Sequence, residues 1–280
     1  MSYLEKASKP LAAAPIITVI GSPGTGKSSF AGTFPNPIFI QAERASSVFE
    51  SWDEDIQPTL LPELPKPTVD AAGNMTASPK EILMAQLREL ATVEHGFKTL
   101  VLDTVTALNL KLEAEAAVRD GVETVADAAG GFHKGYTLVA GWHSEFMHAC
   151  QVLAMRKKMA IVLLGHTGVQ KIKNSPDEAS EYSVYSLDMY PKSAAVYINN
   201  SDAVFYIRKE EFVTGAEKNR KGQTTKYGRV MQTGERKLIT TGDGLTGFVS
   251  AKSRYNMPAE IDLPLGENPV LEFIKFFKEQ

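Results

Sequence analysis

The feature that most constrains the fold of this chain is a glycine-rich turn placed directly after a short apolar run. Residues 16–20 read IITVI and residues 21–28 read GSPGTGKS, a complete G-x-x-x-x-G-K-S match between a predicted strand and a predicted helix at 28–33. Glycines allow backbone N–H groups to point inward around phosphate oxygens, and the start of a helix adds partial positive charge. The alternative is a glycine-rich turn that carries Lys and Ser by chance. We expect the phosphate-binding residues to be Gly21, Ser22, Pro23, Gly24, Thr25, Gly26, Lys27, Ser28 and Ser29.

Apolar runs alternate with longer stretches of helical periodicity along the rest of the chain, which is typical of a mainly parallel sheet flanked by helices. Further strands are predicted at 37–41, 98–103, 159–164 and 203–207, and helices at about 79–94, 105–119 and 136–158. The proline-rich residues 53–79 are predicted to be a surface excursion without an element of its own. We therefore predict an α/β fold with a mainly parallel, twisted sheet and an antiparallel ribbon near the C-terminus, over residues 228–252.

Three segments are expected along the chain. Residues 1–14 form an N-terminal arm, residues 15–266 form the α/β domain, and residues 267–280 form a C-terminal helix packed on that domain. The helix prediction rests on Asn268-Pro269, a capping residue followed by the residue type that tolerates the first helical position.

Composition limits the class of protein. The single cysteine, Cys150, excludes an internal disulfide framework and a zinc cluster built on cysteines. The longest apolar runs are far below the ~18–20 residues that span a bilayer, and the N-terminus lacks the pattern of a secretory signal. We therefore expect a soluble protein of a reducing compartment, with no membrane partner. The net charge of −3 gives no overall sign of nucleic-acid binding, although residues 208–254 hold 11 basic and 5 acidic side chains.

Two carboxylates and the end of the glycine-rich loop are the candidates for chemistry. Lys27 would reach the β- and γ-phosphates of ATP, and the Ser28 hydroxyl would sit on Mg²⁺. Asp103 ends an apolar strand, where a carboxylate can hold Mg²⁺ through water; its alternative role is a helix cap. Thr104 follows, whereas an AAA+ ATPase normally carries its water-activating Glu there. Glu43, two residues past the second strand, is therefore the candidate for orienting and deprotonating water, unless it is simply an exposed loop residue.

These segments together resemble a RecA-like ATPase core. In chain order they are the glycine-rich loop, FIQAERA around Glu43, TLVLDTVTAL around Asp103 and IVLLGHTGVQKI around His166. RecA recombinases are similar in carrying a Glu after the second strand, a Ser or Thr after the metal-binding Asp, and a polar residue at the end of the fourth strand. His166 stands where recombinases carry a Gln that senses the γ-phosphate; a His that hydrogen-bonds locally is the alternative. The resemblance covers about residues 15–255 and implies a RecA-like P-loop NTPase fold.

A tighter resemblance is to phage-encoded RecA-like ATP-binding proteins found in phage recombination gene clusters. The SDAVFYIRKE strand and the AKSRYNMPAEI ending are similar to that family. This resemblance implies a stripped recombinase core associated with single-strand annealing in the cytoplasm of a bacterial host. Its partner there would be a single-strand annealing or single-strand-binding protein.

Lys252 and Arg254 lie in AKSRYNMP, which resembles the AKQRNG-type segment of DnaB-like hexameric helicases. In those proteins a Lys and an Arg project from a late strand into the ATP of the neighbouring subunit. Positive charge at the γ-phosphate can raise the rate by ~10³–10⁵, and two residues this far apart on a strand share one face. The resemblance implies self-association as a ring or filament with composite active sites. The alternative is two solvated surface cations.

RecA-like proteins line the axis of the filament or ring with two loops, one after the third strand and one after the fourth. The corresponding segments here are roughly 117–135 and 167–191. Their cations and aromatic rings suit phosphate contact and base stacking: Lys134, Lys171, Lys173, Tyr182 and Tyr185. Acidic residues outnumber basic ones in the second segment, so the prediction of single-stranded DNA binding rests mainly on the resemblance.

The sequence thus predicts an ATPase of RecA type that binds ATP and Mg²⁺ and acts with single-stranded DNA in recombination or replication. Two other classes stay open. A nucleotide or small-molecule kinase would also use a GSPGTGKS loop, although the chain shows no Arg-rich lid and no acceptor-site motif. An assembly factor gated by ATP, with little hydrolysis, would tolerate the loss of Glu43.

Overall fold

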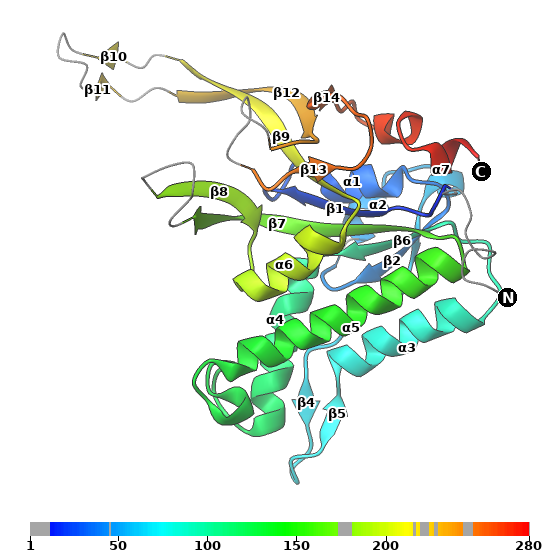
Figure 1. Ribbon diagram of the computed structural model, residues 1–280, viewed down its shortest axis with the longest axis vertical. Coiled ribbons are helices and arrows are strands. Elements are labelled where there is room, and N and C mark those ends of the chain that lie inside the picture. Colours follow the sequence, from blue (N-terminus) through cyan, green and yellow to red (C-terminus); the bar gives the residue numbers. More distant parts are fainter. Residues whose placement is uncertain are drawn as a thin grey trace, which may run out of the picture.

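Parallel strands form the centre of the structure, a computed structural model of the chain (Figure 1). The described residues are 12–44, 46–172, 181–214, 217–218, 224–226, 229–242 and 249–279. Six strands run parallel in the spatial order β9, β1, β7, β6, β2, β3. Their bounds are β1 Ile16–Gly21, β2 Pro37–Gln41, β3 Thr59–Leu60, β6 Thr99–Asp103, β7 Ala160–Ile172 and β9 Ala203–Thr214.

β1 and β6 are buried along their whole length because both faces of the sheet are covered. Every residue of β1 (IITVIG) and of β6 (TLVLD) is buried. A continuous apolar run of this kind is the pattern of a parallel strand between two layers of helices. Because β1, β7 and β6 are neighbours and parallel, residues that end these strands meet at one edge, which we call the carboxyl edge of the sheet.

Helices flank this sheet. Figure 1 shows α3, α4, α5 and α6 gathered on one side of it, and the C-terminal segment near α1. The rings of Phe34 and Phe277 pack edge to face with centroids 5.6 Å apart, which fixes that segment beside the end of α1. Within the described ranges, no helix is both long and apolar enough to cross a membrane. The helix bounds are α1 Lys27–Gly32, α2 Ser46–Phe49, α3 Pro79–Thr92, α4 Val105–Asp120, α5 Lys134–Arg156, α6 Pro191–Asn200 and α7 Lys275–Lys278, with 3₁₀ turns η2 Glu54–Ile56, η3 Ala128–Gly130 and η4 Pro269–Glu272.

Two antiparallel ribbons extend beyond the parallel sheet, and Figure 1 shows them projecting in the same direction. The first pairs the end of β7 with β8, and the second pairs β9 with β12. β13 and β14 extend the sheet beside β9 and β12, whereas β4 with β5 and β10 with β11 form separate two-stranded sheets. The bounds are β4 Thr68–Val69, β5 Met75–Ala77, β8 Tyr182–Leu187, β10 Glu217–Lys218, β11 Thr224–Lys226, β12 Arg229–Ile239, β13 Lys252–Ser253 and β14 Glu260–Asp262.

The predicted fold class is confirmed, since a mainly parallel sheet is flanked by helices and carries an antiparallel ribbon. The predicted loop at 167–191 is wrong in form: β7 continues to Ile172 and pairs with β8, and α6 follows. A two-stranded ribbon outside the core needs no continuous apolar run, so its polar sequence gives no strand signal. Short strands also interrupt the proline-rich stretch, and residues 269–278 form a 3₁₀ turn and one helical turn instead of one amphipathic helix.

Candidate functional site

The glycine-rich loop joins the end of β1 to the start of α1. Gly24 and Gly26 have φ angles of 74° and 85°, a left-handed conformation that other residues adopt at a cost. Thr25 closes the turn by donating from its hydroxyl to the Ser22 carbonyl at 2.9 Å. Gly26 is the N-cap of α1 and provides no side chain to satisfy the first N–H groups of the helix. Such a helix start is a binding site for an anion.

Lys27 is buried inside this loop, with only 6% of its surface exposed. Its ammonium group donates to the carbonyl oxygens of Gly21 and Ser22 at 2.9 and 3.1 Å, and it lies 3.5 Å from His166 Nδ1. Burial lowers the pKa of Lys27, while the nearby carboxylates of Asp103 and Glu43 oppose that shift. The sequence therefore positions a cation at the floor of an anion-binding loop.

Ser28 and Asp103 meet across the carboxyl edge. The Ser28 hydroxyl donates to Asp103 Oδ2 at 2.6 Å, and the Asp103 carboxyl is 2% exposed. Burial raises the pKa of Asp103 to about 6, against the opposing effect of the Ser28 hydrogen bond. Thr104, not Asp103, caps α4, because its side chain accepts from the Ala107 N–H at 3.1 Å. The helix-cap alternative for Asp103 is thus wrong.

The residues at this edge suit a divalent cation that retains several waters. A hydroxyl and a carboxylate are hard oxygen donors, and Mg²⁺ is commonly held by one or two protein groups together with substrate phosphates. Among the described residues, no three His, Cys, Asp or Glu side chains converge as a dedicated metal cage. Ser28 and Asp103 therefore fit Mg²⁺ as part of a phosphate complex.

Glu43 and His166 form a pair above Lys27. The Glu43 N–H donates to the Asp103 carbonyl at 3.1 Å, which fixes the loop after β2 against the end of β6. Glu43 Oε1 lies 3.2 Å from His166 Nε2, and this hydrogen bond is the main reason that the pKa of Glu43 is lowered. Because an ammonium can only donate, His166 Nδ1 accepts from Lys27 and Nε2–H donates to Glu43. His166 thus links the other two residues.

The parallel sheet explains why these residues converge. His166 lies opposite Gly21 in the register of β7 and β1, and Asp103 lies opposite Gln41 in the register of β6 and β2. His166 is also held by its own N–H, which donates to Thr106 Oγ1 at 2.9 Å. The structure therefore brings together Lys27, Ser28, Glu43, Asp103 and His166, each of which the sequence singled out.

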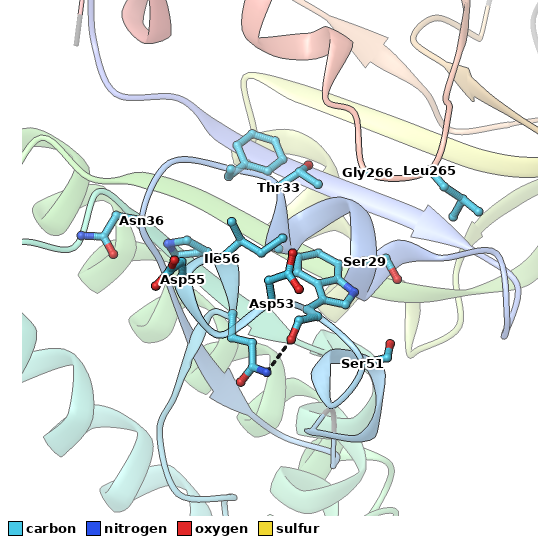
Figure 2. Close-up of a pocket in the computed structure, with 14 residues that line it drawn as sticks. Ser29, Thr33, Asn36, Ser51, Asp53, Asp55, Ile56, Leu265 and Gly266 are labelled. Atoms are coloured by element: carbon cyan, nitrogen blue, oxygen red, sulfur yellow. Dashed lines mark hydrogen bonds between the residues drawn. The ribbon is translucent and has the colours of Figure 1, made fainter.

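A cavity of about 860 Å³ lies beside α1 (Figure 2). Ser29 lines it next to Ser28, and Trp52, Asp53 and Ile56 line it from the segment after α2. Leu265, 78% exposed, completes the cavity from the segment after β14. The Trp52 ring packs on Gly32, where an added Cβ would lie 2.9 Å from the ring. Sequence reasoning missed this cavity; a tryptophan directly before the proline-rich surface stretch was the available signal.

Arg236 of β12 is a second residue that the sequence analysis did not single out. Its guanidinium donates to the carbonyl oxygens of Gly26 at 3.4 Å and Pro264 at 2.9 Å. A Cβ added at Gly26 would lie 2.3 Å from Arg236 Nη1, so the guanidinium would have to move away from the loop. Arg236 thus joins the glycine-rich loop to the segment that carries Leu265.

Lys252 and Arg254 lie away from this cluster, toward the amino-terminal edge of the sheet. Lys252 lies opposite Val204 on β9, whereas Gly21 lies beside Ile207, three residues or ~10 Å farther along the same strand. Arg254 follows the end of β13 and pairs with Asp202 at 2.8 Å. Lys252 Nζ donates to the Asn199 carbonyl at 3.2 Å. A role of either cation at an active site is therefore still a prediction, and it requires a neighbouring subunit.

The predicted nucleic-acid residues occupy the first ribbon and the start of α5. Lys171 on β7 and Tyr185 on β8 are exposed, and Lys134 begins α5. Lys173 and the side chain of Tyr182 lie outside the described part of the structure. The two predicted segments meet where Tyr136, near Lys134, stacks on Tyr190 with centroids 4.7 Å apart.

Tyr185 also connects the first ribbon to the glycine-rich loop. Its ring stacks on Tyr206 of β9 with centroids 6.0 Å apart and an interplanar angle of 11°. Tyr206 and Ser22 of the loop line the same cavity. This cavity, of about 430 Å³, lies between these tyrosines and the loop residues Pro23 and Thr25.

Comparison with known proteins places these motifs in one matched region. A family model described as AAA domain matches residues 13–245, which include the glycine-rich loop, Glu43, Asp103 and His166. Lys252 and Arg254 lie beyond the matched region. No curated protein matches the chain.

Proposed function

The chain belongs to the AAA domain family of P-loop ATPases, and from that premise we propose that it binds Mg²⁺ and ATP, hydrolyses the ATP, and acts as an oligomer with single-stranded DNA. The observation that carries the ATPase part is the convergence of Lys27, Ser28, Asp103, Glu43 and His166 at one edge of the sheet. The nucleic-acid part is supported by the ribbon that bears Lys171 and Tyr185 and by the resemblance to RecA-like phage proteins of recombination.

Lys27 and the loop bind the phosphates in this proposal. Lys27 exchanges its two carbonyl partners for phosphate oxygens, and the N–H groups at the start of α1 donate to them. Bound Mg²⁺ would neutralise charge on the β- and γ-phosphates. Ser28 and Asp103 hold the ion on the side of the loop that faces β6. The Asp103 carboxyl must be ionised for this, which its raised pKa of about 6 allows at neutral pH.

Glu43 orients the attacking water. It lies past the end of β2, and its hydrogen bond with His166 leaves further lone pairs of the carboxylate to accept from water. The lowered pKa makes the ionised carboxylate a weak proton acceptor. Its contribution is therefore to position water next to the γ-phosphate. The water oxygen would bond to that phosphorus while the bond to the bridging oxygen of ADP breaks, and the proton of the water would pass to an oxygen of the released phosphate. His166, which contacts both Lys27 and Glu43, transmits a change at the phosphates to β7 and its ribbon.

The cavity beside α1 receives the base of ATP in this proposal. Ser29 connects it to the phosphate loop, the Trp52 ring offers a stacking surface, and Asp53 supplies an acceptor for an exocyclic amine (Figure 2). The chain has two tryptophans, so a Trp142→Phe variant leaves Trp52 as the only reporter. ADP is expected to change the fluorescence of that variant. An unchanged signal at saturating ADP would place the base elsewhere.

Single-stranded DNA is proposed to bind along the first ribbon. Tyr185 is 44% exposed, and a base stacked on an aromatic ring contributes about 1–3 kcal/mol. Tyr185 stacks on Tyr206, and both rings line a cavity with Ser22 of the phosphate loop, which offers a route by which DNA would alter that loop. Tyr185→Ala is expected to weaken DNA binding about tenfold. Val169→Ala, across the ribbon on β7 and itself exposed, is the matched control.

ATP turnover with and without single-stranded DNA, at several protein concentrations, tests the whole proposal. Stimulation by DNA and a specific activity that rises with protein concentration are expected if Lys252 and Arg254 act in the site of a neighbour. Turnover that responds to neither would contradict the oligomeric, DNA-dependent part. ATP binding with almost no turnover would favour the assembly factor, in line with the weak basicity of Glu43.

A further inference from the structure

Arg236 is a buried cation with no carboxylate partner among the described residues. Arg236 is 8% exposed. Its guanidinium carries five N–H donors, which have two acceptors, the carbonyl oxygens of Gly26 and Pro264. Burial lowers the pKa of Arg236, and no charged neighbour offsets that shift. A guanidinium out of water is costly unless an anion compensates it. The folded chain therefore keeps a positive charge that its own described residues leave unbalanced.

The backbone around Arg236 aims it at the glycine-rich loop. β12 pairs with β9 through Gln232 and Glu211 and then through Arg236 and Lys209, so β12 carries extra residues between these pairs. Gly234 sits within that irregularity with a φ angle of 86°. A bulge of this kind turns the following side chain out of the regular ladder. Lys237, the next residue, instead forms ion pairs with Asp262 and Glu260 of β14.

The position of Arg236 lies between the phosphate loop and the cavity beside α1. One end of the guanidinium contacts Gly26, the residue before Lys27, and the other contacts Pro264, whose neighbours Leu265 and Gly266 line the cavity. A nucleotide whose terminal phosphates occupy the loop and whose base occupies the cavity must pass its first phosphate and ribose across this point. The α-phosphate would therefore supply the negative charge that compensates the buried guanidinium of Arg236.

We propose that Arg236 binds the α-phosphate of the nucleotide in cis, an assignment that rests on the proposed ATP site. It gives up its long contact with Gly26 for the phosphate while holding the Pro264 carbonyl, so that the segment 264–266 is held against the bound base. This contact is distinct from that of Lys252 and Arg254, which would act from a neighbouring subunit at the γ-phosphate. Both ADP and ATP can make the contact with Arg236, whereas a contact at the γ-phosphate requires ATP.

The test compares Arg236→Met with Lys237→Met, a control that removes one positive charge from the adjacent position of the same strand. Arg236→Met is expected to weaken ADP binding ~10–100-fold, the range for losing a charged hydrogen bond at a phosphate. Arg236→Lys is expected to recover part of the affinity, and Lys237→Met to stay within about twofold. ADP affinity unchanged in folded Arg236→Met would overturn the proposal.

A second measurement distinguishes a phosphate contact from a purely structural role of Arg236. Loss of the two carbonyl contacts could by itself loosen the loop and weaken ADP binding. The two diastereomers of ADP that carry sulfur on the α-phosphate report on a group touching that phosphate. The wild type is expected to discriminate between them, and Arg236→Met to lose that discrimination; discrimination retained in the variant would reject the contact. If Lys27→Ala also binds ADP normally, the ATP site itself fails, whereas failure of Arg236→Met alone removes only this inference.

Discussion

The two edges of the parallel sheet carry charged residues in opposite ways. At the carboxyl edge, Lys27 and Asp103 are buried and His166 is partly buried, and they contact one another or their neighbours by hydrogen bonds of 2.6 to 3.5 Å. At the amino-terminal edge, Arg254 is two-thirds exposed and its ion pair with Asp202 faces solvent. Burial raises the pKa of Asp103 to about 6, whereas at the other edge burial lowers the pKa of Lys252 and raises that of the uncharged Tyr255.

The difference shows where the fold stores unfavourable electrostatic energy. Burying charges costs stability unless a ligand or partner compensates them, and sites that accept that cost are candidates for function. The carboxyl edge meets this description within a single chain. The amino-terminal edge does not, so any role for its cations depends on a second chain. Four substitutions test this contrast, from the largest expected change in free energy to the smallest.

Glu43→Gln carries the largest expected effect. It keeps the size of the side chain and removes the charge that orients water, so turnover is expected to fall at least ~10²-fold, as for a misplaced reactant, while ATP affinity changes little. Steady-state turnover and equilibrium binding of ATP measure the two quantities separately. Turnover equal to that of the wild type would transfer the role to another residue and would support the assembly factor.

Asp103→Asn is expected to stabilise the free chain. The pKa of Asp103 is about 6 when folded and near 3.8 otherwise, so folding binds extra protons between these values and stability falls as pH rises through this window. A difference of about two pKa units corresponds to about 3 kcal/mol above pH 6, which Asn avoids. Urea unfolding at pH 7.5 should show the gain, and at pH 3.5 it should vanish. Asp262→Asn, at an exposed ion pair, is the control and should show no gain.

His166→Ala is expected to lower turnover about tenfold, because Glu43 loses the hydrogen bond that fixes it. The acid limb of the pH–rate profile should stay in place, because Asp103, with a pKa of about 6, protonates before Glu43. His166→Gln, whose amide has both an acceptor and a donor, should restore most of the activity. Turnover of His166→Ala equal to that of the wild type would show that the bond does not contribute to catalysis.

Arg254→Ala has the smallest expected effect on the isolated chain. Its exposed ion pair contributes no more than about 1 kcal/mol to stability, and ADP affinity should stay within about twofold. If the cation acts in a neighbour's site, turnover alone should fall, and mixing Arg254→Ala with Glu43→Gln chains should restore part of it. Unchanged turnover would leave the two edges independent and reject the role in trans.

The position of each site residue in the fold determines whether the sequence alone could predict it. Glu43, Asp103 and His166 follow or end apolar strands, and parallel strands bring such positions to one edge regardless of other details. Arg236 and Trp52 could not be placed in this way. The aim of Arg236 depends on the register and bulge of β12 against β9, and Trp52 reaches the cavity through a short irregular segment. The long end of β7 was missed because a two-stranded ribbon has no buried face to impose a pattern.

The central claim is that residues 21–28, with Asp103, form the nucleotide site. Calorimetric titration of Mg²⁺ and ADP into the wild type and into Lys27→Ala tests it most directly, with thermal unfolding to verify that the variant is folded. The account predicts one site per wild-type chain and an affinity at least ~100-fold weaker in the variant, since the buried ammonium contributes several charged hydrogen bonds. Equal affinity in the two proteins would contradict it.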